Sequence, residues 1–383
     1  MRIIPTRTAK PGMRLGRPIV DSAGRLILPA GVTLRQRYVE ILRDQGFASI
    51  YVADDPDQVD LPEIINLETR QEVVHCVMDF VATGIIRGLG RAQASRDDLL
   101  LEGKVSGRPN PELAANVTRV ARMLVDDILS QKDVVIGLLD IKSLHDYTYA
   151  HSVQVALIAM TAAKVMGFSK KDILDLGVGS LLHDVGKVAV PDHVWNKPGQ
   201  LTPEEVSQVK LHAQAGFDFV RKSDGGLLPA HVAYQHHERW NGSGYPRGLK
   251  GEQILGLARL CAVCDVFDAI TSDRPYKEAT HPSTALAFLS EKSGMLFDPR
   301  AVEAVRAVVA PYPVATNVVL STGETAVVKK INNVDLSRPV VVIIKDRNRR
   351  YYRVKREIDL SRDLDISVVS YVTLRNSAEA ADA

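Results

Sequence analysis

Cysteine is scarce in this sequence, with three residues in a chain of 383. So small and odd a number excludes a disulfide scaffold and is typical of the reducing cytoplasm, where we expect the protein to reside. Cys261 and Cys264 lie among apolar neighbours, and no second cysteine pair accompanies them. We therefore interpret them as small buried side chains rather than as a zinc or redox site.

The sequence also lacks an excess of either charge. Its 48 Lys and Arg residues nearly balance 46 Asp and Glu residues, for a formal net charge of +2. That balance argues against a dedicated polyelectrolyte binder, and we interpret the basic run at residues 345–356 as the solvated face of a hairpin. We therefore expect no nucleic-acid partner.

No apolar run is long enough to suggest a membrane segment. The longest strongly apolar stretch, residues 153–163, contains Gln154. It falls short of the roughly 20 residues that a spanning helix needs. The N-terminus lacks the apolar segment of a signal peptide, so we expect neither a leader nor a membrane span.

The pattern along the chain predicts a mainly α protein in four parts. We expect a small N-terminal α/β domain at residues 1–62, a helical linker region at 63–125, an all-helical domain at 126–314 and a small β module at 315–376. The β module has short β-branched runs separated by polar turns, which is compatible with a small barrel. A helical pattern that begins at Pro111 and continues to Leu139 has one apolar face. This helix before His151 could pair with neighbouring helices or form the seam of a homodimer.

Histidine and aspartate carry the chemical signal of the helical domain. Neutral imidazole and carboxylate groups are the ligands that hold divalent metals in mixed nitrogen and oxygen sites. Several such residues lie within apolar stretches, where an unpaired charge would cost several kcal/mol. This favours metal ligands over histidines of an ordinary core. The residues and their contexts are His151 in YTYAHS, His183 and Asp184 in LLHDVGK, His212 in VKLHAQAG, His236 and His237 in YQHHERW, and Asp265 in CDVFDAI.

Over roughly residues 145–310 the sequence resembles the HD-GYP family, the cyclic di-GMP phosphodiesterase branch of the HD hydrolases. The matching segments occur in the family's order: LLHDVGKVAVPDHVWNKPGQLTPEE, HHERWNGSGYPRGLKGE, ARLCAVCDVFDAITSDRPYK and GMLFDPR. The N-terminal segment PGMRLGRPIVDSAGRLILPAG resembles a segment often found ahead of such domains. The resemblance implies an all-helical domain that hydrolyses cyclic di-GMP to pGpG. Further hydrolysis of pGpG to GMP is left open.

The resemblance also implies a ligand set for two metals. Some family members have a glutamate four residues before the first histidine and bind a third metal. Tyr147 occupies that position here, so we expect two divalent ions, Fe or Mn first and Zn or Co as alternatives. We expect Asp268 to support a ligand rather than bind an additional ion. The implied ligands are His151, His183, Asp184 and Asp265 for one metal, with Asp184 bridging, and His212, His236 and His237 for the second.

Two metals roughly 3.5–4 Å apart can lower the pKa of a bridging water and neutralise charge on a phosphodiester. We therefore expect Asp184 and Lys187 to be catalytic. Lys187 follows the His-Asp pair by about one helical turn, within reach of the phosphate. Arg274 and Lys277 resemble the family's phosphate-contacting pair, so we expect these two residues and Lys187 to bind substrate.

Two interpretations of the segment Gly244-Tyr245-Pro246 remain open. Its glycine and proline content predicts a tight loop, which would either shape the surroundings of the second metal or, as the resemblance implies, dock diguanylate cyclase domains. Two alternatives to cyclic di-GMP hydrolysis also remain open. One is a weakly active or inactive module that senses the nucleotide or recruits cyclases, and the other is hydrolysis of a different cyclic dinucleotide.

Overall fold

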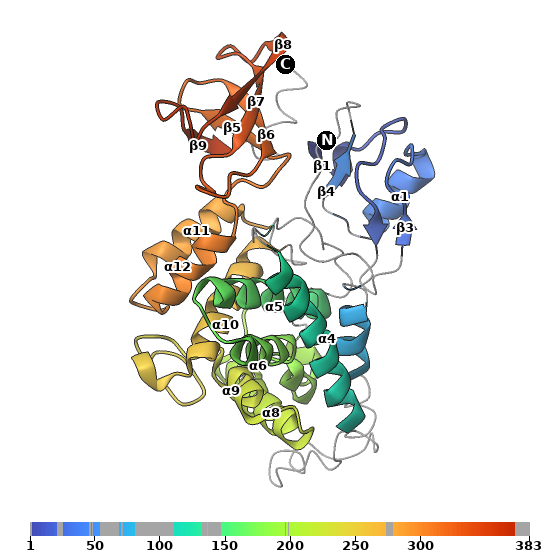
Figure 1. Ribbon diagram of the computed structural model, residues 1–383. Helices are drawn as coiled ribbons and strands as arrows, with labels where there is room; N and C mark the ends of the chain where they lie inside the picture. The colour runs from blue at the N-terminus through green and yellow to red at the C-terminus, as the bar shows by residue number, and fades with distance from the viewer. Residues whose placement is uncertain are drawn as a thin grey trace.

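The computed structural model of the chain is mainly helical, with a small α/β unit at its N-terminus and a small antiparallel sheet at its C-terminus (Figure 1). The fold class predicted from the sequence is therefore confirmed. None of the described helices is both long and apolar enough to cross a bilayer. The structure describes residues 2–20, 26–45, 47, 49–53, 69, 72–80, 111–131, 136, 147–195, 197, 199–272 and 279–371.

The N-terminal unit combines short antiparallel strand pairs with one helix. Strand β1 pairs with β4, and β2 pairs with β3. Leu15, Leu42 and Val52 are fully buried between these elements and form the centre of a separate small core. The elements are β1 (Arg2–Pro5), η1 (Thr6–Thr8), β2 (Ile19–Val20), β3 (Leu26–Leu28), α1 (Gln36–Asp44) and β4 (Ser49–Val52).

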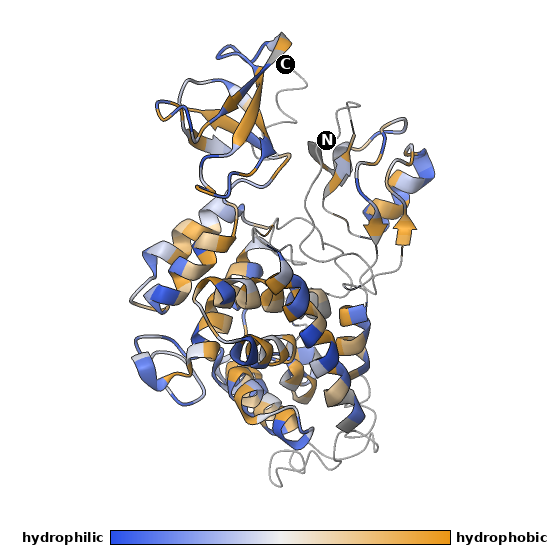
Figure 2. Cartoon of the chain, in the orientation of Figure 1, coloured by the Kyte–Doolittle hydropathy of each residue, from blue (hydrophilic) through white to orange (hydrophobic). Residues whose placement is uncertain are grey.

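The helical body contains the candidate residues and the largest core. Residues 72–80 are also helical and contribute Phe80 to this core. The outer helices α8 and α12 show hydrophobic and hydrophilic positions alternating around them, as expected for helices with one buried face (Figure 2). The elements are α4 (Pro111–Ser130), α5 (Tyr147–Val165), α6 (Lys170–Leu181), η3 (Val185–Ala189), α7 (Asp192–Trp195), α8 (Pro203–Lys222), α9 (Leu227–Gln235), η4 (Gly251–Gln253), α10 (Gly256–Thr271), α11 (Pro282–Glu291) and α12 (Pro299–Val308).

Helix α5 is the central helix of this body. It is apolar on nearly every side, which is the pattern of a helix surrounded by others. It packs against α4, α6, α10 and α12, and Val153, Ile158 and Met160 are fully buried within the core. The central position of α5 places His151, in its second turn, inside the body rather than at its surface.

The long helix expected from Pro111 to Leu139 is shorter than predicted. Helix α4 ends at Ser130, and Ile136 instead forms an isolated parallel bridge with Val309. The apolar face of α4 is buried in the core of its own chain, with Val120 and Leu124 fully inaccessible. The apolar periodicity thus reflects packing against α5 and α6 within the chain. Residues 132–135 and 137–140 lie outside the described residues.

The C-terminal module is a five-stranded antiparallel sheet in the order β8-β7-β6-β5-β9. Strands β8 and β9 are its edges, so the described residues do not close into the barrel that the sequence was compatible with. Tyr371 in β9 stacks on His281, which caps α11, with ring centroids 3.8 Å apart and ring planes at 12°. This stack joins the module to the helical body. The strands are β5 (Asn317–Leu320), β6 (Thr325–Lys330), β7 (Val340–Lys345), β8 (Tyr351–Asp359) and β9 (Val368–Tyr371).

Candidate metal centre

Three helices and two turns direct the candidate ligands into one cluster. His151 projects from α5, His212 from α8 and Asp265 from α10. The vicinal pair His183 and Asp184 lies in the turn between α6 and η3. A turn lets two consecutive side chains face one cluster, which a helix would direct about 100° apart. His236 and His237 occupy the equivalent turn directly after α9.

The expected ligands form two adjoining groups. Within each group, one nitrogen or oxygen atom from every residue lies within 4.8 Å of the others. All seven side chains are buried except His237, which is partly exposed. The groups are His151, His183 and Asp265, and Asp184, His212, His236 and His237.

The carboxylate of Asp184 lies between the two groups. Its Oδ2 is 3.3 Å from His183 Nε2 and 3.7 Å from His151 Nε2. Its Oδ1 is 3.7 Å from His212 Nε2 and 3.9 Å from His236 Nε2. Each oxygen therefore faces a different set of imidazoles, which is the arrangement of a carboxylate shared by two sites.

Hydrogen bonds fix the tautomer of three imidazoles. The Nδ1 atoms of His183, His212 and His236 are 2.7, 2.7 and 2.8 Å from the carbonyl oxygens three residues earlier. A carbonyl only accepts, so each Nδ1 must donate and each neutral ring presents an unprotonated Nε2 to the cluster.

With these tautomers, the buried Nε2 atoms that face the cluster have lone pairs to which no proton donor is directed. The Nε2 atoms of His212 and His236 face each other at 3.4 Å. His183 Nε2 has no hydrogen-bond partner in the part of the chain that the structure describes. Lone pairs directed at one another repel unless a cation or proton lies between them. The donor set therefore fits divalent cations.

The electrostatics also suit cation binding. Burial lowers the pKa of His212 and His236, and it lowers the pKa of His237 to about 3, so these rings are neutral at physiological pH. Burial opposes ionisation of Asp184, but the Lys187 ammonium together with the His183 and His151 rings outweighs burial, and they hold the pKa of that carboxyl well below its usual range. Neutral imidazoles beside ionised carboxylates are the protonation state that binds metals.

His151 differs because carboxylates face both of its nitrogens. Its Nδ1 is 2.7 Å from Asp268 Oδ2, and its Nε2 is 3.2 Å from Asp265 Oδ1. Burial disfavours the charged ring, but the hydrogen bonds to Asp265 and Asp268 outweigh burial and raise the pKa of His151 to about 9. Hydrogen bonding to His151 likewise lowers the pKa of Asp265 against the effect of burial. Asp268 thus lies behind the candidate ligand His151 and belongs to neither of the two groups.

The substrate-binding candidates are only partly described. Lys187 Nζ pairs with Asp184 Oδ2 at the outer side of the cluster. Arg274 and Lys277 lie outside the described residues, in the segment between α10 and α11. Tyr147 begins α5, and its side chain is likewise not described.

Comparison with protein families places this cluster in a known domain. A model of the HD domain matches residues 133–301, and a model of the KOW domain associated with the HD domain matches residues 317–380. Residues 133–301 are an HD domain. The ligand cluster lies entirely within it, which agrees with the resemblance found in the sequence.

Several named proteins are similar to part of this chain. A cyclic di-GMP phosphodiesterase of Pseudomonas aeruginosa is 38% identical over 250 residues, covering 64% of this chain and 60% of the relative. A cyclic di-GMP phosphodiesterase response regulator of Xanthomonas campestris is 43% identical over 160 residues, covering 41% of this chain and 42% of the relative. A 3′3′-cGAMP-specific phosphodiesterase of Vibrio cholerae is 34% identical over 184 residues, covering 47% of this chain and 35% of the relative. The chain therefore spans only part of the length of each relative.

Gly186 determines how closely two parts of the HD domain approach. A Cβ atom on this residue would lie 2.0 Å from the carbonyl oxygen of His212 and 2.4 Å from the amide nitrogen of Gly216. Only glycine lets η3 pack this tightly on α8, which brings Asp184 to His212. Sequence reasoning missed this role, although only Val185 separates the glycine from the His-Asp motif.

The Gly244-Tyr245-Pro246 segment packs its tyrosine against a candidate ligand of the HD domain. The Tyr245 ring stacks on His237, with centroids 4.7 Å apart and planes at 27°. A Cβ on Gly244 would lie 2.4 Å from the amide nitrogen of Arg239. The buried carboxylate of Glu238 accepts hydrogen bonds from the amides of Arg247 and Leu249, at 2.8 and 2.9 Å. Glu238, which the sequence analysis overlooked, thus secures the loop beside His237.

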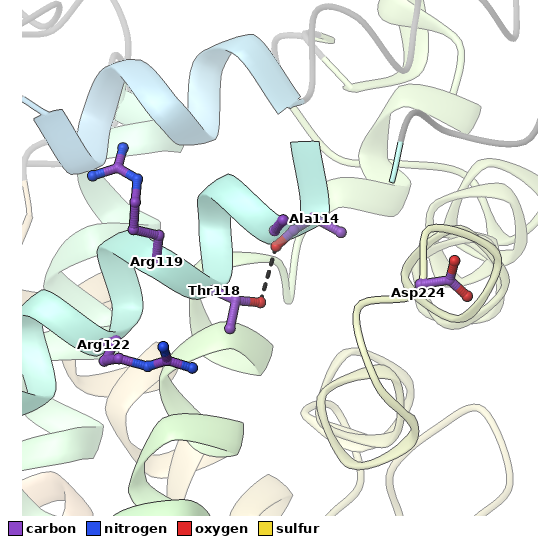
Figure 3. A pocket seen from close by; sticks show the side chains of 6 residues that line it. Ala114, Thr118, Arg119, Arg122 and Asp224 are labelled. Carbon is purple, nitrogen blue, oxygen red and sulfur yellow. Dashed lines mark hydrogen bonds between the residues drawn. The ribbon is translucent and has the colours of Figure 1, made fainter. Parts of the chain in front are cut away.

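A pocket lined mainly by α4 lies apart from the candidate metal centre. It has a volume of about 400 Å³ and lies between α4 and the turn after α8 (Figure 3). Figure 3 shows Arg122 and Asp224 on its walls and Thr118 bonded to the carbonyl of Ala114. No candidate ligand lines this pocket, so the cluster and the pocket are separate features.

Proposed function

We propose that the HD domain hydrolyses cyclic di-GMP to linear pGpG with two divalent cations. The observation that carries the proposal is the carboxylate of Asp184, whose two oxygens face two separate sets of imidazoles. The Pseudomonas and Xanthomonas relatives are named as cyclic di-GMP phosphodiesterases, which supports cyclic di-GMP as the substrate.

The donor set fits one cation in each group. His151, His183 and Asp265 would hold one, while His212, His236 and His237 would hold the other, and Asp184 would be shared. When bound, such a pair supplies an activated water and neutralises charge on the phosphate. We propose Fe or Mn as the metal, with Zn or Co as alternatives, because mixed imidazole and carboxylate ligands bind all four.

The chain's own cations would orient the phosphate. Lys187 holds its ammonium beside Asp184, at the side of the cluster where its side chain is 19% exposed. A phosphate oxygen that enters from this side meets that ammonium, which offsets the charge that develops during displacement. We propose Arg274 and Lys277, which follow α10 in the chain, as further phosphate contacts.

The test is Asp184→Asn in protein purified anaerobically, with metal content and cyclic di-GMP turnover measured on the same sample. We expect fewer than two metals per chain and loss of turnover, because the amide no longer supplies a shared anionic bridge. Asp175→Asn is the control, since that residue pairs with Lys171 on the surface of α6. Full turnover by Asp184→Asn, or no turnover by the metal-loaded parent protein, would contradict the proposal.

A second candidate substrate is 3′3′-cGAMP. The observation in its favour is the Vibrio cholerae relative, which is 34% identical and is named as specific for that dinucleotide. A substrate panel with both dinucleotides decides between them, and chromatography of the products shows whether hydrolysis stops at pGpG or proceeds to GMP.

A binding role can be separated from the enzymatic one. Gly244-Tyr245-Pro246 could recruit diguanylate cyclases through its exposed Pro246, although Tyr245 faces His237. Asp184→Asn should leave such docking intact while it abolishes hydrolysis. Gel filtration of the same samples tests the homodimer, which would have to use surfaces other than the buried apolar face of α4.

A further inference from the structure

Trp195 provides an exposed aromatic surface beside the cluster. The residue is well exposed, although its side chain is a large apolar ring. The exposed fraction of the side chain is 5% for Asp184 and 19% for Lys187, and Trp195 as a whole residue is 38% exposed. The row of these three residues leads from the candidate metal centre to solvent.

The cation of Lys187 connects the two ends of this row. Its Nζ contacts Asp184 and lies 4.2 Å from the centroid of the Trp195 ring. Trp195 belongs to the short helix α7, where its amide donates to the carbonyl of Pro191 at 3.1 Å. A phosphate bound at Lys187 would therefore have an indole ring next to it.

We propose that Trp195 stacks on one base of the dinucleotide whose phosphate lies at Lys187, and so acts as a base-recognition residue. The inference rests on the proposed function. A sugar places a nucleobase close to its own phosphate, and every purine presents a flat face that an indole can cover. The indole beside Lys187 should therefore make a nucleotide bind more tightly than a phosphodiester that has no base.

The first test compares two substrates of the metal-loaded protein, cyclic di-GMP and bis(4-nitrophenyl) phosphate. Trp195→Leu is expected to raise KM for the dinucleotide about tenfold, since loss of base stacking has an effect of that order. Hydrolysis of the diester without a purine base should change by less than about twofold. Trp195→Phe should restore part of the dinucleotide KM. Equal losses on both substrates would overturn the proposal, because they would show that Trp195 acts only by holding Lys187.

The second test uses fluorescence, because the chain has two tryptophans. Trp240 packs instead against the guanidinium of Arg259, 5.4 Å from its ring centroid, and serves as the matched control. In Trp240→Phe, a phosphorothioate analogue of cyclic di-GMP that resists hydrolysis should quench the Trp195 emission saturably. Inorganic phosphate should not, and neither ligand should quench Trp195→Leu.

The outcomes separate this inference from the proposed function. Turnover of cyclic di-GMP together with unchanged Trp195 emission, at analogue concentrations where calorimetry shows saturation, would overturn base stacking and leave the hydrolytic function standing. Saturable quenching in a metal-loaded protein that never cleaves cyclic di-GMP would support stacking and overturn the proposed hydrolysis.

Discussion

His151 and Asp268 are 117 residues apart in the sequence, yet His151 Nδ1 lies 2.7 Å from Asp268 Oδ2. This contact turns His151 Nε2 toward Asp184 and Asp265, where a cation would bind. A carboxylate behind an imidazole ligand fixes its orientation and increases its basicity. Asp268 therefore contributes to the cluster without belonging to either group of ligands.

Asp268→Ala should weaken binding of the cation at His151 by about 10- to 100-fold, because the ring loses the partner that orients it. Metal titration calorimetry measures the change. Asp268→Asn, whose amide oxygen still accepts a hydrogen bond, should recover part of the affinity. Ser272→Ala is the control. It removes the hydroxyl that donates to Asp268 Oδ2 at 3.2 Å but leaves the contact of Asp268 with His151 in place. Unaltered affinity in Asp268→Ala would show that packing alone orients His151.

Gly186→Ala should lower turnover by about 100-fold or more, because the added methyl group pushes η3 away from α8 and separates Asp184 from His212. Turnover and metal stoichiometry are the measurements, with circular dichroism as the check on folding. In the control, Gly256→Ala, the new Cβ meets only the flexible end of Arg259, at 3.4 Å. If both variants kept full activity, the close contact of η3 with α8 would have no part in forming the site.

The stability of the metal-free protein should be highest near neutral pH. The pKa of His237 falls from 6.5 to about 3, chiefly through burial, so its stabilising contribution is present above 6.5 and is lost as the pH falls toward 3. The hydrogen bonds to Asp265 and Asp268 outweigh burial and raise the pKa of His151 from 6.5 to about 9, so its contribution is present below 6.5 and is lost as the pH rises through 9.

Urea unfolding of chelator-treated protein between about pH 3 and pH 9 tests both the acidic and the alkaline loss of stability. His151→Gln should remove the alkaline decline, and a decline that persists unchanged would mean that other groups cause it. Added metal should displace the proton of His151, so binding should release protons and become tighter as the pH rises toward 9.

Tyr371→Ala should lower the free energy of unfolding by about 1 kcal/mol, because it removes the stack on His281. His281 caps α11, which follows the segment with Arg274 and Lys277, so KM for the substrate should also rise while metal content stays constant. Tyr371→Phe keeps the stacked ring and should behave like the parent protein. Val369→Ala, at an exposed position of β9, is the control. Equal behaviour of Tyr371→Ala and this control would show that the stack does not affect the site.

Residue types and motif order were enough to predict the class of this protein and the chemical groups at its centre. Imidazoles and carboxylates within apolar stretches have few stable roles other than metal ligation, so the sequence predicted the cluster. Apolar periodicity likewise predicted the helical body, and β-branched runs predicted the C-terminal sheet. Apolar periodicity overestimated the length of the helix that begins at Pro111. Helix α4 ends at Ser130, but the chain beyond it still has buried apolar residues such as Ile136, and these extended the pattern.

Which individual atoms lie in contact became known from the folded chain alone. It placed one oxygen of Asp184 toward each set of imidazoles, Asp268 behind His151, and the Trp195 ring under Lys187. These contacts depend on how the helices pack, α10 against α5 and α8 against α9, and on the close approach that Gly186 permits. Local sequence patterns encode neither quantity, because each is set by packing between segments far apart in the chain.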